Sequence, residues 1–405
     1  MKGRALVLGL LLLATSLPAM ALPAHPGRDV ERLSPGIPFL GTGVLQAQTP
    51  PPSGAGSSAS PLSGGGGATF QTFRFSDAEA VGIESISLLT TPFAAGIRLG
   101  GAVRIEASTT FAQGTLARPG GESVSVSGLT DTRIQLLTDL VPGRLTVSGL
   151  VSLPTGADGF SVEEVGLAGA VAADLLPFQI SSWGSGGGVG GGVAFFQPAG
   201  SVGFGGSIGY TIPGEFAPVR DADFLYRPGA ALTVQGVVDY TLDQRSRLAL
   251  QVNWNRFDDD EVQGVNLYRS GDRLEARGSW AFVAGDRGSG VAWAGYLHRS
   301  EGAFLDDLRS RPAQGLYFAG IGLRQPWRGA VLAPTAELRV QRRDDGTDQG
   351  TLAGAGLRVE VPAGDVLVVP RIQLRGGSVL IRDGVESSVV GIEAGVGIRF
   401  GGQGS

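Results

Sequence analysis

Apolar and polar side chains alternate residue by residue along most of this chain, from about Thr69 to Phe400. The alternating segments are about ten residues long and are separated by turns rich in Gly and Pro. A period of two places successive side chains on opposite faces of a β-strand. The pattern therefore predicts an all-β fold whose strands have one apolar and one polar face.

Four segments show the alternation most clearly: residues 103–111, 248–255, 273–282 and 390–400. Their polar faces carry Arg, Glu, Gln and Asn in mid-strand. Such residues are expected on the wall of a water-filled barrel lumen, beneath an apolar exterior that faces lipid. The strands of a soluble β-sandwich alternate in the same way. The period alone therefore does not show whether the apolar faces meet lipid or the core of a soluble protein.

The connections between the predicted strands alternate in length, which favours a membrane barrel. Short turns are expected near Gly100, Pro142, Pro198–Gly200 and residues 242–246, 284–289, 326–330 and 362–364. Longer connections are expected at residues 113–130, 154–186, 212–229, 257–271, 300–313, 342–350 and 376–387. Bacterial barrels have short periplasmic turns and long extracellular loops. Aromatic residues beside the short turns (Tyr240, Trp280, Phe282, Trp327 and Phe400) predict an interfacial girdle.

The strand count follows from these turns. Seven short turns join fourteen strands, residues 387–400 add one more, and residues 69–76 supply the partner that an even number requires. We therefore predict a transmembrane antiparallel up-and-down β-barrel of about 14–16 strands. Sixteen is the favoured number, and fourteen applies if residues 69–82 fold inward as a plug.

One stretch breaks the strand rhythm. Ser161 and Glu164 have the spacing of a helix capping box, and the following run to Leu176 ends before Pro177. We expect a short helix at the barrel mouth or inside the lumen. The alternatives are an extracellular loop without a helix and an additional strand.

The N-terminal region predicts export. Lys2 and Arg4 precede an apolar run from Ala5 to Leu13, and Ala19-Met20-Ala21 resembles a cleavage site. The run is short for a retained membrane anchor, which is the alternative. We expect a signal peptide at 1–21, a disordered Pro/Gly/Ser-rich linker at 22–68, an outer-membrane barrel at 69–400 and a tail at 401–405.

Composition narrows the function classes. The chain has 67 Gly, no Cys, 17% charged residues and a net charge of −5. Without cysteine there are no disulfides, thiol nucleophiles or cysteine metal sites. The small negative charge gives no basic field for nucleic acid, so no nucleic-acid partner is expected.

The charged residues on the predicted polar faces are the candidate lumen-lining residues. They are Arg104, Glu106, Arg133, Arg273, Glu275, Arg277, Glu337, Arg339, Arg358, Glu360, Arg371, Arg375, Glu393 and Arg399. They could create a field that selects solutes. They could equally form cross-strand ion pairs that fill the interior and stiffen the wall, and both roles can coexist.

The sequence offers little for catalysis, cofactors or metals. Of the two histidines, His25 falls in the linker and His298 ends a strand. The acidic runs Asp258–Glu261, Asp306–Asp307 and Asp344–Asp345 lack EF-hand spacing. A Gly186-x-Gly188-x-x-Gly191 match lies in a glycine tract without a buried strand before it or a helix after it. We therefore predict no catalytic, cofactor-binding or metal-binding residues and no enzyme activity.

Three short motifs carry a family resemblance. Ser127-Gly128-Leu129-Thr130-Asp131-Thr132, Leu153-Pro154-Thr155-Gly156 and Tyr226-Arg227-Pro228-Gly229 resemble elements of the MetA-pathway phenol-degradation barrels, which look related to long-chain fatty-acid transporters. Position 130 is Thr where the family pattern usually has Gly, and the resemblance is anchored only between about residues 84 and 260. It implies a channel for small hydrophobic or aromatic compounds.

The combined expectation is an outer-membrane channel for passive uptake of small molecules. The alternatives are a structural or adhesive barrel with a closed lumen and a lipid-acting barrel enzyme. Expected partners are outer-membrane lipid and lipopolysaccharide, the barrel-assembly machinery and a small-molecule solute. Terminal Phe400, with alternating apolar residues before it, resembles the signal that the assembly machinery reads.

Overall fold

The computed structural model describes residues 62–157, 159–220, 224–285, 287–305, 310–382 and 384–400. The predicted signal peptide, the predicted tail and most of the predicted linker lie outside these residues.

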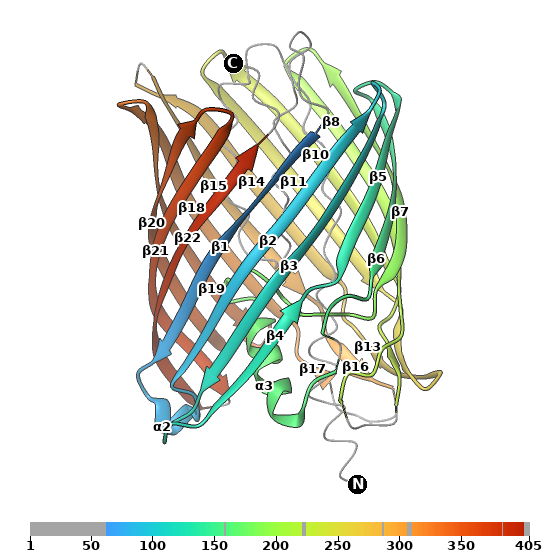
Figure 1. The fold of residues 1–405 in the computed structure, drawn as a ribbon, viewed down its shortest axis with the longest axis vertical. Helices are drawn as coiled ribbons and strands as arrows, with labels where there is room; N and C mark the ends of the chain where they lie inside the picture. The colour runs from blue at the N-terminus through green and yellow to red at the C-terminus, as the bar shows by residue number, and fades with distance from the viewer. Residues whose placement is uncertain are drawn as a thin grey trace.

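Sixteen antiparallel strands form a closed barrel (Figure 1). The barrel strands are β1 (Leu62–Phe75), β2 (Ser85–Leu99), β3 (Val103–Ala117), β5 (Thr132–Val141), β6 (Leu145–Leu153), β7 (Gly188–Ala199), β8 (Val202–Pro213), β10 (Ala231–Asp243), β11 (Ser246–Phe257), β14 (Arg273–Ala284), β15 (Gly288–Arg299), β18 (Gln314–Trp327), β19 (Ala330–Arg343), β20 (Asp348–Ala363), β21 (Val366–Arg382) and β22 (Val385–Phe400). Each pairs with the next barrel strand, and β1 pairs with β22 from Gly64↔Phe400 to Phe75↔Val389 to close the wall. The predicted fold class and the favoured strand number are confirmed.

The exterior of the barrel is apolar. Along β22 the exposed side chains include Val390, Ile392, Val396 and Ile398, and the intervening residues face the interior. Beside the short turns, Tyr240, Trp280, Trp327 and Phe400 are 41%, 45%, 52% and 44% exposed. An apolar band with an aromatic girdle on a closed barrel is the exterior of a protein that spans lipid. The chain is therefore a β-barrel of the bacterial outer membrane.

The barrel begins earlier than predicted. Leu62 to Ala68, assigned to the linker, belong to β1 and pair with both β2 and β22. A Cβ on Gly67 would lie 2.3 Å from the carbonyl oxygen of Val396, and one on Gly65 would lie 2.8 Å from that of Ile398. The glycine tract therefore allows β1 to lie close to β22. Its composition alone resembles that of a linker, which explains the error.

The two ends of the barrel differ. In Figure 1 the short turns lie at the top, and the other end carries the additional elements. These are α2 (Ala78–Val81), α3 (Val162–Val171), β4 (Ser123–Leu129) and a five-stranded sheet of β9 (Tyr226–Arg227), β12 (Asp259–Val262), β13 (Val265–Arg269), β16 (Gly302–Phe304) and β17 (Ser310–Arg311). We call this the long-loop end.

Three expected long connections are instead largely strand. Residues 113–130 form a hairpin in which β4 pairs with the end of β3. At residues 342–350 and 376–387 the flanking strands continue to tight turns, between Arg343 and Asp348 and between Arg382 and Val385. Polar strand ends that project beyond the membrane resemble loops in a hydropathy pattern, which explains the error.

The predicted helix is present as α3, and its capping box is complete. The Ser161 hydroxyl accepts from the Glu164 backbone N–H, and the Glu164 carboxylate accepts from the Ser161 backbone N–H at 2.7 Å. The helix ends at Val171, before the predicted limit near Leu176. Within the described part of the chain, no helix has the length and apolar character needed to cross a bilayer.

Residues 159–187, between β6 and β7, fold against the inner wall, and we call them the plug segment. Its buried side chains include Leu167, Val171, Leu176, Phe178 and Trp183. They form one apolar core with inward-facing residues of eight barrel strands: Phe73, Phe75, Ile86, Leu88, Ala112, Leu116, Leu297, Leu316, Leu352, Val379 and Val389. The plug segment therefore occupies the interior at the long-loop end.

Candidate functional site: the lumen wall and its plug

The predicted lumen-lining residues lie on the strand faces opposite the exposed apolar side chains. Arg104 and Glu106 flank outward-facing Ile105 and form an ion pair of 3.0 Å. Arg133, inward-facing on β5, lies in the field of Asp131. The structure joins most of the other candidates into three groups.

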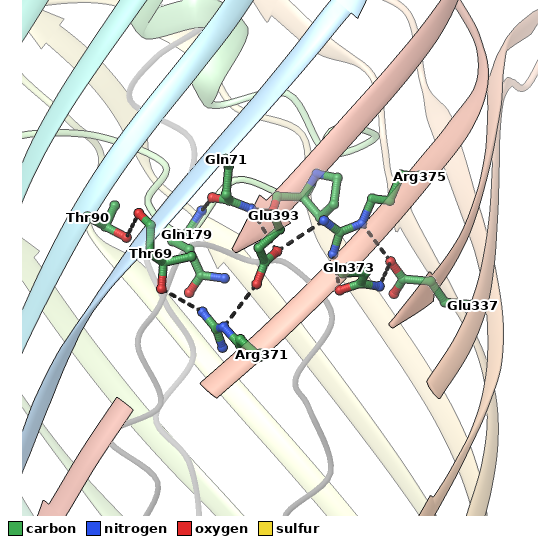
Figure 2. Close-up of polar contacts among 10 residues, drawn as sticks. Thr69, Gln71, Thr90, Gln179, Glu337, Arg371, Gln373, Arg375 and Glu393 are labelled. Carbon is green, nitrogen blue, oxygen red and sulfur yellow. Dashed lines mark hydrogen bonds and ion pairs between the residues drawn. The ribbon is translucent and has the colours of Figure 1, made fainter. Parts of the chain in front are cut away.

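The first group connects β19, β21 and β22 (Figure 2). The Arg375 guanidinium bonds Glu337 at 2.8 Å and Glu393 at 3.0 Å, and Arg371 reaches Glu393 at 3.1 Å. Gln373 donates to the Glu337 carboxylate at 2.8 Å. Arg375 and Glu393 are 7% and 4% exposed, so these charges are balanced within a buried network. This first group therefore braces the barrel wall by linking β19, β21 and β22.

The same network holds the plug segment to the wall. The Gln71 side-chain amide on β1 donates to Glu393 at 3.1 Å and to the carbonyl oxygen of Pro177 at 2.8 Å. Its own oxygen accepts from the backbone N–H of Gln179 at 2.9 Å (Figure 2). Gln71 is fully buried, and it both donates to and accepts from the backbone of the plug segment. Its bond to the Glu393 carboxylate fixes the orientation of its side chain.

The second group lies near the short turns. Glu360 pairs with Arg358 at 3.0 Å and also with Arg324. Arg399 and Arg371 add positive charge to the same region. Arg324, Arg358 and Arg399 therefore share the Glu360 carboxylate, which leaves the interior positive near this mouth.

The third group surrounds Asp174 of the plug segment at the long-loop end. Arg299 approaches its carboxylate at 3.1 Å and Arg273 at 3.9 Å. Arg339 donates to the carbonyl oxygens of Asp174 at 3.1 Å and Leu175 at 3.4 Å. Glu275 and Arg277 lie on β14 beside Arg273, and their charges act on each other.

The electrostatics of Asp174 show which influence dominates. Burial raises the pKa of this carboxyl, but Arg299, Arg273, Arg311 and Arg339 together outweigh burial and hold its pKa below the usual range. Asp174 is therefore a stable anion that fastens the plug segment to the wall.

Sequence reasoning missed Asp174, Arg299, Arg311 and Arg324. A signal for Asp174 was available, because it is a lone charge between Ala172-Ala173 and Leu175-Leu176. A charge in an apolar run is rarely buried without a partner. Its partners could not be identified, since they lie on strands about a hundred residues away or more.

The first two of the motifs that carried the family resemblance meet at the base of the plug segment. The Asp131 carboxylate accepts from the backbone N–H groups of Gly156 (3.1 Å), Ser185 (2.9 Å) and Gly187 (3.2 Å), and from the Ser185 hydroxyl (2.8 Å). A Cβ on Gly156 would lie 2.2 Å from the carbonyl oxygen of Trp183. These positions therefore need an acidic side chain and a glycine for architectural reasons.

The third motif closes the five-stranded sheet. The Tyr226 hydroxyl donates to Asp260 at 2.8 Å, and the Gly229 backbone N–H donates to the same carboxylate at 2.7 Å. A Cβ on Gly229 would lie 2.0 Å from the carbonyl oxygen of Asp258. Neighbouring carboxylates of the acidic run Asp258–Glu261 therefore have different partners: Asp260 bonds Tyr226 and Gly229, whereas Asp259 pairs with Arg269 at 2.7 Å.

His298 lies at the exposed rim, where its ring lies 3.2 Å from the Asp344 carboxylate and stacks on Tyr296. The nearby Ser300 hydroxyl donates to the carbonyl oxygen of Asp272. Within the described residues, no group of three or more His, Cys, Asp or Glu side chains is placed to hold a metal ion. Asp306 and Asp307 lie outside the described residues.

The sequence matches no protein-family model and no curated protein, so the phenol-degradation family remains a resemblance. Among solved structures, Pseudomonas putida OprB is similar at 10% identity with a TM-score of 0.46, over 84% of this chain and 94% of that one. An anion-selective porin from Comamonas acidovorans is similar at 13% identity and 0.38, over 84% and 98%. Vibrio cholerae OmpT is similar at 11% identity and 0.40, over 85% and 99%. The membrane architecture of this chain follows from its own strand pairing and apolar exterior.

Proposed function

We propose that this chain is an outer-membrane channel for passive uptake of small molecules and that its lumen favours anions. Nine of the fourteen predicted lumen positions are Arg and five are Glu. The interior also holds Arg247, Arg299 and Arg324 against Asp139, Asp239 and Asp174, so the positive excess persists. Arginine rings on a pore wall attract anions and repel cations. This excess is the observation that carries the proposal.

The resemblance adds a second restriction on the solute. It implies small hydrophobic or aromatic compounds, whereas the wall favours negative charge. Aromatic carboxylates and phenolates satisfy both conditions, and we propose them as the solute class. Outer-membrane lipid and lipopolysaccharide against the apolar exterior, and the barrel-assembly machinery at the Phe400 end, are proposed as partners.

Ion selectivity in a planar lipid bilayer tests the proposal. In a potassium chloride gradient, the reversal potential of the purified protein should show chloride permeating better than potassium. Replacing Arg358 and Arg399 by Gln should lower that preference, because both add positive charge near the short-turn mouth. Arg328→Gln is the matched control, since this arginine lies over the Trp327 ring in a short turn.

Preference for potassium in the unmodified protein would contradict the proposal. Heat-modifiable gel migration establishes that each variant is folded.

The apolar core between plug segment and wall favours a second candidate, a structural barrel with a closed lumen. A correctly folded barrel that conducts no ions would support it. Uptake of benzoate into proteoliposomes then separates a plugged transporter, which accumulates the solute, from a structural barrel, which does not. The lipid-acting enzyme has no such support, since the Ser300 hydroxyl near His298 donates to the carbonyl oxygen of Asp272.

A further inference from the structure

The plug segment docks where the barrel wall is closed by its first and last strands. We call the pairing of β1 with β22 the seam. Gln71 and Glu393 are direct partners across the seam, and both belong to the network that bonds the plug segment (Figure 2). No turn joins these two strands, so their pairing carries the entropic cost of closing the whole chain. The seam is therefore the part of the wall that gains most from an additional connection.

Side-chain links across the seam lie in its half at the long-loop end. From Gly64 to Gly67, β1 offers only backbone to β22. Beyond these glycines, the Gln71 amide donates to Glu393 at 3.1 Å. The Phe73 ring covers Gly391 of β22 and leaves no room for a Cβ there. The half of the seam that has side-chain links is thus the half against which the plug segment packs.

Three consecutive plug residues contact these same β1 side chains. The Gln71 amide donates to the carbonyl oxygen of Pro177 at 2.8 Å, and its oxygen accepts from the Gln179 backbone N–H at 2.9 Å. Between these bonds, the Phe178 ring meets the Phe73 ring edge-on, with 5.2 Å between the ring centroids. The side chains of Gln71, Phe73 and Phe178 are all buried. Residues 177–179 therefore grip the β1 side of the seam with both polar and apolar contacts.

The β22 side of the seam sets the positions of the β1 side chains that are gripped. Glu393 orients the Gln71 amide and is itself held by Arg375 at 3.0 Å. Gly391 supplies the surface on which the Phe73 ring lies. With β22 separated, Gln71 would lose its orienting carboxylate and Phe73 its contact. A joined seam therefore binds residues 177–179 better than a separated one, and by linkage their docking favours the joined seam by the same factor.

We propose that residues 177–179 are a clasp that locks the seam of the barrel. Docking of the plug segment then completes closure of the wall, and opening of the seam releases the plug segment. This role goes beyond the proposed channel function, because the clasp acts whether or not the lumen conducts ions.

Hydrogen exchange of the folded, detergent-solubilised chain tests the clasp strand by strand. Phe178→Ala removes the ring that meets Phe73. Phe160→Ala is the matched control, because Phe160 is also a buried plug residue but packs edge-on against Trp183, which bonds β3 at Ala112. In Phe178→Ala, amides that bond across the seam should exchange at least about tenfold faster, while those between β2 and β3 change less. Phe160→Ala should leave the seam amides unchanged.

A disulfide across the seam gives a second readout, since the chain has no cysteine of its own. Thr72 and Ile392 are partners across the seam, and Val238 and Leu250 are partners between β10 and β11. In Phe178→Ala, the folded gel band should be lost at a lower temperature than in the unmodified protein. The pair Thr72→Cys and Ile392→Cys should restore that temperature, and the pair Val238→Cys and Leu250→Cys should not. Phe178→Leu, a milder change, takes the place of Phe178→Ala if the latter does not fold.

The two readouts decide between a clasp and a segment that only fills the lumen. Seam exchange that is unchanged in Phe178→Ala, or that rises equally in Phe160→Ala, would overturn the clasp. Equal rescue by both disulfides would also contradict it, because general stabilisation would then explain the effect. Neither readout involves ion flow, so failure of the channel function leaves this test intact.

Discussion

At the scale of single residues, Asp131 shows how a short motif becomes architecture. Its carboxylate accepts four hydrogen bonds from residues at both ends of the plug segment. Thr155 adds to this junction through a bond between its hydroxyl and the Thr132 backbone N–H at 2.9 Å. A charged acceptor that gathers several N–H donors stabilises more than neutral bonds do. The motif therefore fixes the two points where the chain enters and leaves the lumen.

Replacing Asp131 by Asn should loosen the plug segment without opening the barrel wall. The amide keeps the shape but turns one acceptor oxygen into a donor that faces N–H groups. We expect a loss of about 1.5–3 kcal/mol, the range for hydrogen bonds to charged groups. Hydrogen exchange of residues 159–187 measures it. Asp243→Asn, which removes a carboxylate from a short turn, is the control. Equal protection of the plug segment in both variants would rule out the anchoring role.

The alternation within each strand predicted which face of the strand a side chain occupies. It did not predict the partner that the side chain bonds. Alternation placed Arg375 and Glu393 on the inner face, because a strand's period is independent of its neighbours. The bonds that Gln71 makes with Pro177 and Gln179 span 106 and 108 positions in sequence. No pattern within one strand carries that information, so the bracing and the arginines around Asp174 appeared only in the folded chain.

At the scale of elements, the capping box predicted α3 but did not predict the surface against which the helix packs. The answer lies in the inward faces near the long-loop end, where apolar residues such as Phe73, Leu88 and Leu352 replace polar ones. These positions lie on the same strand faces as the polar lumen residues. The change from polar to apolar side chains along one face was therefore the sequence signal for a segment packed inside the barrel. The five-stranded sheet was missed for another reason: its strands are two to five residues long.

This small sheet should lose stability as pH rises from about 4 to 6. Burial raises the pKa of Asp260 from 3.8 to about 6, although the Gly229 backbone N–H and the Tyr226 hydroxyl oppose the shift. The folded sheet therefore binds a proton that the unfolded sheet releases between these values. The contribution is fully present below the unfolded pKa and is lost as pH passes the folded pKa.

Hydrogen exchange of β12 and β13, corrected for the intrinsic rate, measures the effect. Opening should become easier by at most about 3 kcal/mol, the equivalent of two pKa units. Asp260→Asn should remove this pH dependence, because its amide does not titrate. In Asp259→Asn it should persist between pH 4 and 6, since pairing with Arg269 holds the pKa of Asp259 below its usual range. Unchanged pH dependence in the Asp260 variant would show that another group is responsible.

At the scale of the whole molecule, the barrel is wide and partly filled. A barrel of sixteen strands encloses enough room for an aqueous channel. Here the plug segment and the inward apolar residues occupy the long-loop end, whereas charged residues line the remainder. In the proposed channel we therefore expect permeation to be limited at the long-loop end and ion selectivity to be set by the charged wall beyond it.

Removing the plug segment should separate these two roles. In a variant whose residues 160–182 are replaced by a short Gly/Ser linker, Asp131 keeps its bonds to Gly156 and Ser185 while the apolar core is lost. Single-channel conductance should rise severalfold, because the constriction is gone. Chloride preference should remain, because Arg358 and Arg399 are untouched. Thermal stability should fall, since Phe73 and Leu88 then face water.

The matched control shortens the β3–β4 turn at residues 118–121, which lies at the same end but outside the apolar core. It should leave conductance unchanged. If the plug deletion leaves conductance unchanged while heat-modifiable migration shows a folded barrel, the constriction lies elsewhere along the wall. If conductance rises and chloride preference disappears, the narrow passage that the plug segment creates is what makes the lumen selective, and the short-turn arginines alone do not suffice. The two readouts together therefore assign size and charge selection to separate parts of one lumen.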